Sequence, residues 1–123
     1  MILTEDTGIG DYHIRAYEPG AVTVNDTVYN KSVIVSPYAL IVDWTPQSLD
    51  ELQDEHLKPI LEIKPEIVLL GTGVIFKMPP PKQIASLYQR KLGVECMDTG
   101  AACRTYAALM SEGRKVVAAL LIK

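Results

Sequence analysis

The hydrophobic pattern of the chain consists of short apolar runs separated by turn residues. Residues 67–70 (Ile-Val-Leu-Leu) form an unbroken apolar run of strand length. Such a run is typical of a strand that is covered on both faces, as in a parallel sheet between helices. Gly71 and Gly73 follow it, and glycine permits the backbone angles of a sharp turn. The pattern therefore predicts a buried strand that ends in a tight turn.

The segment from residue 12 to residue 36 shows a different pattern, in which apolar and polar side chains alternate over short stretches. Residues 19–20 (Pro-Gly) and 25–26 (Asn-Asp) divide these stretches, and all four residues favour turns. Pro37 ends the last stretch, because proline has no N–H for a strand ladder. Alternation with frequent turn signals predicts a meander of antiparallel strands, followed by a further short strand at 40–42.

The next segment carries the start signal of a helix. Ser48 and Glu51 have the spacing of a capping box, in which the serine caps the helix and the glutamate reaches back to the N–H of that serine. Pro59 interrupts the apolar pattern, because a proline does not fit a regular helix interior. We therefore expect two short helical turns or a restart near Asp54.

The second half of the chain alternates between helical and strand-length patterns. Apolar residues recur at helical spacing over 84–92, and Gly93 is a typical helix end. Residues 94–97 and 116–122 have the length and composition of strands, and 101–111 has that of a helix.

This order of elements predicts an α/β fold. Strands near Ile67, Val94 and Val116 that are joined by right-handed helical crossovers lie side by side, with at least two of them parallel. We expect a small domain with a central mixed sheet, helices packed on it, and an N-terminal β-meander or hairpin.

Composition and charge limit the class of protein. The 123 residues are 48% apolar and 22% charged, which is typical of a globular protein. The length suits one core, so we expect a single domain over residues 1–123. The net charge of −3 argues against a protein that binds nucleic acid by neutralising phosphates.

The sequence also predicts where the protein is found. Residues 1–6 lack the basic start and the apolar core of a secretory signal, and no apolar run reaches the length of a membrane-spanning helix. Cys96 and Cys103 do not make a disulfide framework. We expect a cytoplasmic protein with reduced thiols and no insertion into membranes.

Side chains that carry catalysis are scarce in this sequence. His13 and His56 are far apart, and neither has a carboxylate or cysteine at metal-binding spacing. No histidine lies near Cys96 or Cys103, which are expected to be small core residues rather than nucleophiles. We therefore predict no catalytic residue, no bound metal and no cofactor.

Two loops form the best candidate for a ligand site. Ligands bind α/β sheets beyond the carboxyl ends of parallel strands, where the loops at 71–73 and 98–100 are expected. The candidate binding residues are Gly71, Thr72, Gly73, Asp98, Thr99, Gly100 and, one turn further on, Arg104.

Each of these residues also has a structural explanation. The Gly-x-Gly pattern of 71–73 matches a dinucleotide fingerprint poorly, because Phe76 stands at the third glycine position and three prolines follow instead of a helix start. Asp98 or Thr99 is a suitable helix cap. Arg104 is equally compatible with a solvated helix face.

Several stretches of the chain carry a family resemblance: 65–73 (PEIVLLGTG), 97–106 (MDTGAACRTY), 111–114 (SEGR), 32–37 (SVIVSP) and Trp44. Together they resemble the Mth-type domain of unknown function over nearly the whole chain. This family includes the mitochondrial complex I assembly factor 3 and the adipogenesis-associated Mth-domain protein. The resemblance implies a compact α/β fold with a mixed sheet and a β-hairpin. It implies no catalytic residue, because the family has no established reaction.

Two functional hypotheses follow. The first is a non-enzymatic interaction or assembly factor, with a role in respiratory complex assembly implied by the resemblance, a protein partner of unknown identity, and a homodimer also compatible with the sequence. The second is a protein, or an enzyme, that binds a small anion or small molecule between the 71–73 and 98–100 loops.

Overall fold

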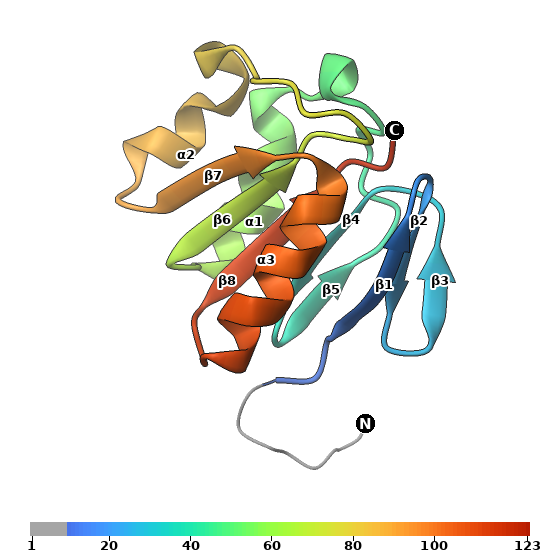
Figure 1. Cartoon of the computed structure of the whole chain (residues 1–123). Helices are drawn as coiled ribbons and strands as arrows, with labels where there is room; N and C mark the ends of the chain where they lie inside the picture. Colours follow the sequence, from blue (N-terminus) through green and yellow to red (C-terminus); the bar gives the residue numbers. More distant parts are fainter. Residues whose placement is uncertain (1–9) are drawn as a thin grey trace.

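A five-stranded mixed sheet forms the centre of the computed structural model, which describes residues 10–123 (Figure 1). The strands lie in the order β5-β4-β8-β6-β7. Strand β6 pairs in parallel with both β7 and β8, whereas β4 runs antiparallel to β8 and β5. The bounds are β4 Val33–Ser36, β5 Ala39–Ile41, β6 Ile67–Gly71, β7 Gly93–Met97 and β8 Val116–Leu120. The prediction of a mixed sheet with neighbouring parallel strands is confirmed.

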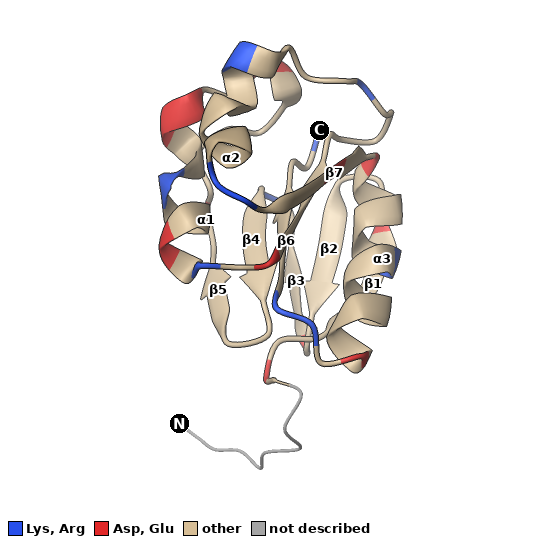
Figure 2. Cartoon of the chain, turned by 90° about the vertical axis from the view of Figure 1, so that its left-hand side faces the viewer, with Lys and Arg blue, Asp and Glu red and all other residues tan. Residues whose placement is uncertain are grey.

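Helices cover both faces of this sheet, as Figure 2 shows with the sheet seen between them. Helix α3 (Thr99–Ser111) packs on one face, against β6 and β8. Helices α1 (Lys58–Ile63) and α2 (Ala85–Gln89) lie on the opposite side. All five residues of β8 are buried, as the unbroken apolar run at its position in the sequence requires.

A second, three-stranded antiparallel sheet lies on the α3 side of the molecule. Its strands are β1 (Ile14–Glu18), β2 (Ala21–Val24) and β3 (Thr27–Tyr29), which pair in chain order. Val22 and Val24 point into the same hydrophobic cluster as Tyr106 and Met110 of α3. The Tyr106 hydroxyl donates to the Tyr12 carbonyl oxygen at 2.8 Å. The predicted β-meander is confirmed for β1 to β3, and it closes one side of the core. Residues 33–36, which the sequence assigned to the same meander, instead form β4 of the central sheet.

The segment between β5 and β6 corrects one local prediction. Ser48 makes no side-chain cap, and the Glu51 carboxylate accepts the N–H of Gln47 at 2.8 Å, one residue earlier than the capping box requires. The expected restart near Asp54 is confirmed, because two 3₁₀ turns, at Leu49–Glu51 and Asp54–Leu57, precede α1. Short 3₁₀ turns accommodate a segment that Pro59 prevents from becoming one long helix.

The end of α2 corrects a second prediction. The helix follows a 3₁₀ turn at Pro81–Ile84 and stops at Gln89, with Arg90 already extended. Gly93 does not end the helix but is the first residue of β7. The Gly93 N–H donates to the Glu66 carbonyl at 2.9 Å. Hydrogen bonding within the sheet therefore makes Gly93 the start of β7.

The glycines and polar side chains of residues 1–11 predict a loose chain start, and residues 1–9 of that segment lie outside the described residues. Gly10 and Asp11 are anchored: the N–H groups of Asp11 and Tyr12 both donate to the Pro37 carbonyl, at 2.7 and 3.3 Å. Gly10 lies against the same proline in a left-handed conformation that favours glycine. Residues 10–12 are therefore joined to Pro37, which directly follows β4.

Helices long and apolar enough to cross a membrane are absent from residues 10–123.

Replacing Tyr106 by phenylalanine should lower the free energy of unfolding by about 1 kcal/mol, because the Tyr12 carbonyl loses its hydrogen-bond donor while the ring stays packed. Urea unfolding followed by circular dichroism measures this. Tyr88→Phe is the matched control, since Tyr88 is exposed and donates no hydrogen bond within residues 10–123. Equal stabilities for the two variants would contradict the assigned role of the Tyr106 hydroxyl.

Candidate functional site

The loops at 71–73 and 98–100 lie side by side at the carboxyl ends of β6 and β7. The Thr99 N–H donates to the Gly73 carbonyl at 2.8 Å, and the Gly73 N–H donates to Thr99 Oγ1 at 2.9 Å. Thr99 Oγ1 in turn donates to the Leu121 carbonyl at 2.6 Å. The structure thus brings the loops together as the sequence predicted, and it joins them to each other and to the end of β8.

At this junction the two loops pack directly against each other. Thr99 is fully buried, and a Cβ atom on Gly71 would lie 2.9 Å from both its Cα and its Oγ1. The Thr72 N–H donates to the Met97 carbonyl at 2.8 Å. The Thr72 hydroxyl accepts the Lys77 N–H at 3.0 Å and donates to the Ile75 carbonyl at 3.3 Å. The polar groups that a ligand would need are therefore engaged within the protein.

Asp98 has the structural role that the sequence left open. Its carboxylate accepts the Ala101 N–H at 2.8 Å and so caps α3. The ring of Tyr17 in β1 covers the next turn, where a Cβ on Gly100 would lie 3.1 Å from two ring carbons. Burial, followed by the nearby Cys103 and Asp98, raises the pKa of the Tyr17 hydroxyl. The start of α3 is therefore closed off by a neutral aromatic side chain.

Arg104 lies one turn into α3 on its exposed face, and it makes no ion pair within residues 10–123. The structure gathers the other six candidate residues, but each is explained by local structure. Ligand binding by these loops and by Arg104 stays a prediction.

The two cysteine side chains are poor nucleophiles. Burial raises the pKa of the Cys103 thiol to about 12, with a smaller lowering effect from Arg104 and a raising effect from Asp98. Burial and the neighbouring Glu95 also raise the pKa of Cys96. Both thiols are therefore protonated near neutral pH, as core residues are expected to be. Within residues 10–123, no three His, Cys, Asp or Glu side chains are grouped as a metal site requires.

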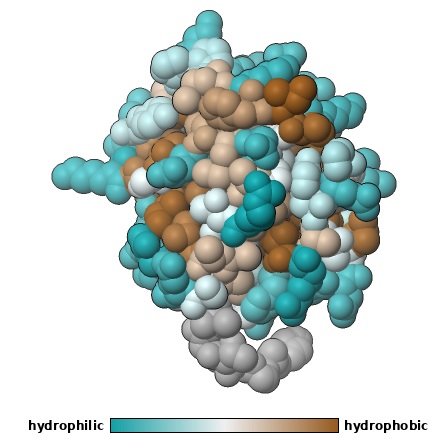
Figure 3. Space-filling model, in the orientation of Figure 1, coloured by the Kyte–Doolittle hydropathy of each residue, from teal (hydrophilic) through white to brown (hydrophobic). Residues whose placement is uncertain are grey.

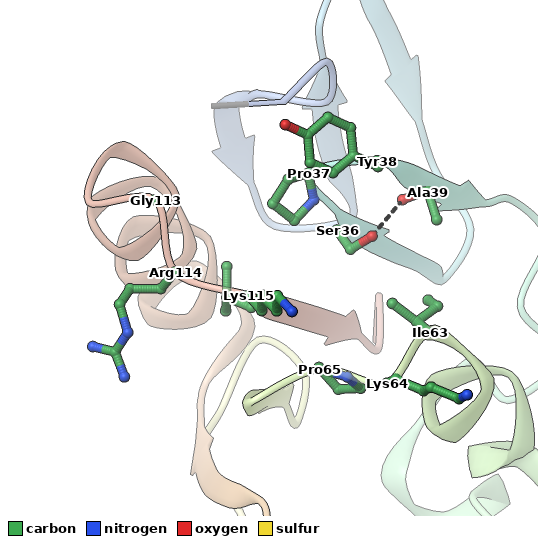
Figure 4. A pocket seen from close by; sticks show the side chains of 11 residues that line it. Ser36, Pro37, Tyr38, Ala39, Ile63, Lys64, Pro65, Gly113, Arg114 and Lys115 are labelled. Carbon is green, nitrogen blue, oxygen red and sulfur yellow. Dashed lines mark hydrogen bonds between the residues drawn. The ribbon is translucent and has the colours of Figure 1, made fainter. Parts of the chain in front are cut away.

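A concave feature that the sequence analysis missed lies at the other end of the parallel strands. This amino-end groove has a volume of about 530 Å³ and is lined by residues 36–39, 63–65 and 113–116 (Figure 4). Lys64 and Lys115 both precede parallel strands, which is a weak signal that two basic side chains share one edge. No pattern in the sequence indicates that the β4–β5 turn completes the groove.

A second feature that sequence reasoning missed is an exposed apolar loop directly after β6. We define the apolar loop as residues 74–78, in which Val74, Ile75, Phe76 and Met78 are exposed. In the sequence, these residues stand between the 71–73 turn and three prolines, and no periodicity there indicates whether they are buried or exposed. Large apolar side chains clustered on a surface mark interaction sites more often than isolated ones do.

Comparisons with known proteins identify relatives of this chain. The sequence model of the family described as "Protein of unknown function (DUF498/DUF598)" matches residues 14–121. The chain is 30% identical to a protein of Francisella tularensis subsp. holarctica named "13 kDa major membrane protein", over 94% of this chain and 95% of that protein.

Two further relatives link the chain to assembly factors and to a known fold. It is 31% identical to NADH dehydrogenase [ubiquinone] 1 alpha subcomplex assembly factor 3 of Danio rerio, over 88% of this chain and 63% of that factor. It therefore spans less than two thirds of the factor. The solution structure of a Bordetella pertussis protein described as a Mth938-like domain is similar, with 29% identity, a TM-score of 0.79, and 99% and 92% of the two chains covered. The resemblance to the Mth-type domain is confirmed.

Replacing Thr99 by valine should lower the free energy of unfolding by about 2–4 kcal/mol, because the Gly73 N–H and the Leu121 carbonyl both lose a buried partner. Urea unfolding measures this change. Thr105→Val is the control on the same helix, because the hydroxyl of Thr105 contacts only the Met97 sulfur at 3.5 Å. A Thr99→Val protein as stable as the control would show that the junction is not held by this hydroxyl.

The thiol environments predict an order of chemical reactivity. A maleimide reagent at neutral pH should modify half-buried Cys96 faster than Cys103 in the folded protein. Cys103 is nearly fully buried, and burial raises the pKa of its thiol to about 12, so little reactive thiolate forms. Mass spectrometry of peptides after timed labelling gives both rates. In urea the two rates should become equal, and faster labelling of Cys103 in the folded state would contradict the structure.

Proposed function

Because this chain belongs to the family of proteins of unknown function described as DUF498/DUF598, and because a complex I assembly factor is among its relatives, we propose that it is a protein-interaction or assembly factor without a reaction of its own. The observation that carries this proposal is the apolar loop, 74–78. Its exposed side chains are the ones that a partner would bury, and it directly follows the carboxyl end of β6.

The side chains of the apolar loop are exposed to solvent, although most of them are hydrophobic. Ile75 and Met78 have exposed fractions of 70% and 67%. Figure 3 shows hydrophobic surface at the upper edge of the molecule, where the chain leaves β6. Burying a side chain such as Phe or Ile contributes about 1.5–3 kcal/mol, so a few such residues supply much of the free energy of a specific contact.

Constraints at both ends order the backbone of the apolar loop. At its start, the Thr72 hydroxyl accepts the Lys77 N–H and donates to the Ile75 carbonyl, which folds residues 72–77 back on themselves. At its end, Pro79–Pro81 limit the backbone. A loop that is ordered before binding loses less conformational entropy on docking, which favours recognition of a partner.

Respiratory complex assembly is the specific role that we propose. The supporting observation is the relationship to the Danio rerio assembly factor, of which this chain spans less than two thirds. We therefore propose a partner that presents an apolar pocket on a protein of that complex or on one of its assembly intermediates. The expected cytoplasmic location stays a prediction, and the name of the Francisella relative makes the membrane fraction a necessary part of the test.

Replacing Ile75 and Phe76 together by serine should reduce recovery of the bound partner about tenfold or more, because two exposed apolar anchors are lost. The measurement is cross-linking in cells, capture of the tagged protein from cytoplasmic and membrane fractions, and quantitative mass spectrometry. The variant should fold normally, since both side chains are exposed.

Tyr88→Ser is the matched control, because Tyr88 is an exposed aromatic residue on α2, outside the apolar loop. It should leave recovery unchanged. Equal recovery with the loop variant would refute the proposal. Capture of a second copy of the chain alone, lost in the same variant, would instead assign the loop to a homodimer.

A further inference from the structure

The amino-end groove lies at the opposite end of the sheet from the apolar loop, so it is independent of the proposed protein contact. Three segments form its walls: the β4–β5 turn, the end of α1, and the connection from α3 to β8. Its volume of about 530 Å³ falls in the usual range for small-molecule sites, which is about 300–1,000 Å³.

Apolar groups form most of the groove. Pro37 comes from the β4–β5 turn, Ile63 and Pro65 from the end of α1, and Val116 from β8. Of these, Pro37, Pro65 and Val116 are buried, and Ile63 is half-buried. Such a lining favours the hydrocarbon part of a ligand, because water is released from both surfaces on contact.

Polar groups at the groove are few and mainly basic. Figure 4 shows the Lys115 side chain directed toward the middle of the lining residues, while Arg114 points away. The Arg114 guanidinium is near Glu66, with Nε and Oε1 3.8 Å apart. Lys64 and Lys115 have no ion pair within residues 10–123. Lys64 lies on the connection that precedes β6, and Lys115 on the connection that precedes β8.

Hydrogen bonds within the protein hold the walls of the groove in place. The Lys115 carbonyl accepts the N–H groups of Glu66 and Ile67, at 2.8 and 3.2 Å, which joins the connection into β8 to the start of β6. The Ser36 hydroxyl donates to the Ala39 carbonyl at 3.3 Å and fixes the opposite turn. Lys64 adopts a left-handed conformation, with φ of 59°, where the chain turns from α1 into the groove wall.

We propose that the amino-end groove binds a small amphipathic organic anion, with one carboxylate at the Lys115 ammonium and an apolar body against Pro37, Ile63 and Pro65. One inward-directed cation matches one carboxylate rather than a polyphosphate. The volume of the groove suits a short hydrocarbon chain or a single ring system. This inference goes beyond the assembly role, because it concerns a different ligand at a different end of the sheet.

The test is an NMR titration of the ¹⁵N-labelled full chain with octanoate, using octanol and octylammonium as probes with the same hydrocarbon chain. Octanoate should cause saturable shifts in amides around Tyr38, Lys64 and Lys115. Octanol should bind more weakly and octylammonium weakest, because only the carboxylate gains the ion pair. Raising the salt concentration should weaken octanoate binding and leave octanol binding unchanged.

Lys115→Gln should weaken octanoate binding about fivefold, with no change for octanol, because it removes the charge and keeps the side-chain stem. Lys91→Gln is the control, since Lys91 is exposed after α2 and lies outside the groove. Ala39→Phe should abolish binding of both probes by filling the space, and its amide spectrum verifies the fold.

Three results would overturn the proposal. One is the absence of saturable shifts at the groove. The second is octanoate shifts confined to the apolar loop, and the third is equal effects of the Lys115 and Lys91 substitutions. None of these results bears on capture of a protein partner through the apolar loop, so the two proposals fail separately.

Discussion

One hydroxyl group connects the parts of this structure that are far apart in sequence. Thr99 Oγ1 accepts the Gly73 N–H and donates to the Leu121 carbonyl, while the Thr99 backbone N–H donates to the Gly73 carbonyl. These bonds join the end of β6, the start of α3 and the end of β8. Gly71 is required beside them, because a Cβ there would meet Thr99 at 2.9 Å. The helix therefore begins against the sheet itself, which fixes how the hydrophobic face of α3 packs.

That junction also decides which surfaces remain available for function. In parallel sheets the carboxyl ends of the strands usually provide the ligand site. Here the loops at that end bind each other, and the ring of Tyr17 covers Gly100. The apolar side chains that follow β6 are exposed in the apolar loop, 74–78. The open concave surface lies at the other end, where the connections into β6 and β8 meet the β4–β5 turn.

The sequence predicted the architecture well because its main signals are local and strong. The apolar run at 67–70, the cap at Asp98 and the helical spacing over 101–111 each specify an element, and right-handed crossovers then place the parallel strands together. Local signals failed at two places, one through a bond to a neighbouring residue in the chain and one through a tertiary contact. Glu51 accepts the N–H of Gln47 instead of that of Ser48, and Gly93 joins the sheet ladder instead of ending α2.

The sequence by itself determined the order of the elements, the mixed sheet and the closeness of the 71–73 and 98–100 loops. Tertiary structure alone decided whether those loops leave a gap, because that depends on the approach of Thr99 to Gly71 across 28 positions of sequence separation (99 − 71). It also decided that residues 36–39, 63–65 and 113–116 form one groove. Hydrophobic periodicity reports which face of an element is buried, but it holds no information on which distant turns meet at the end of a sheet.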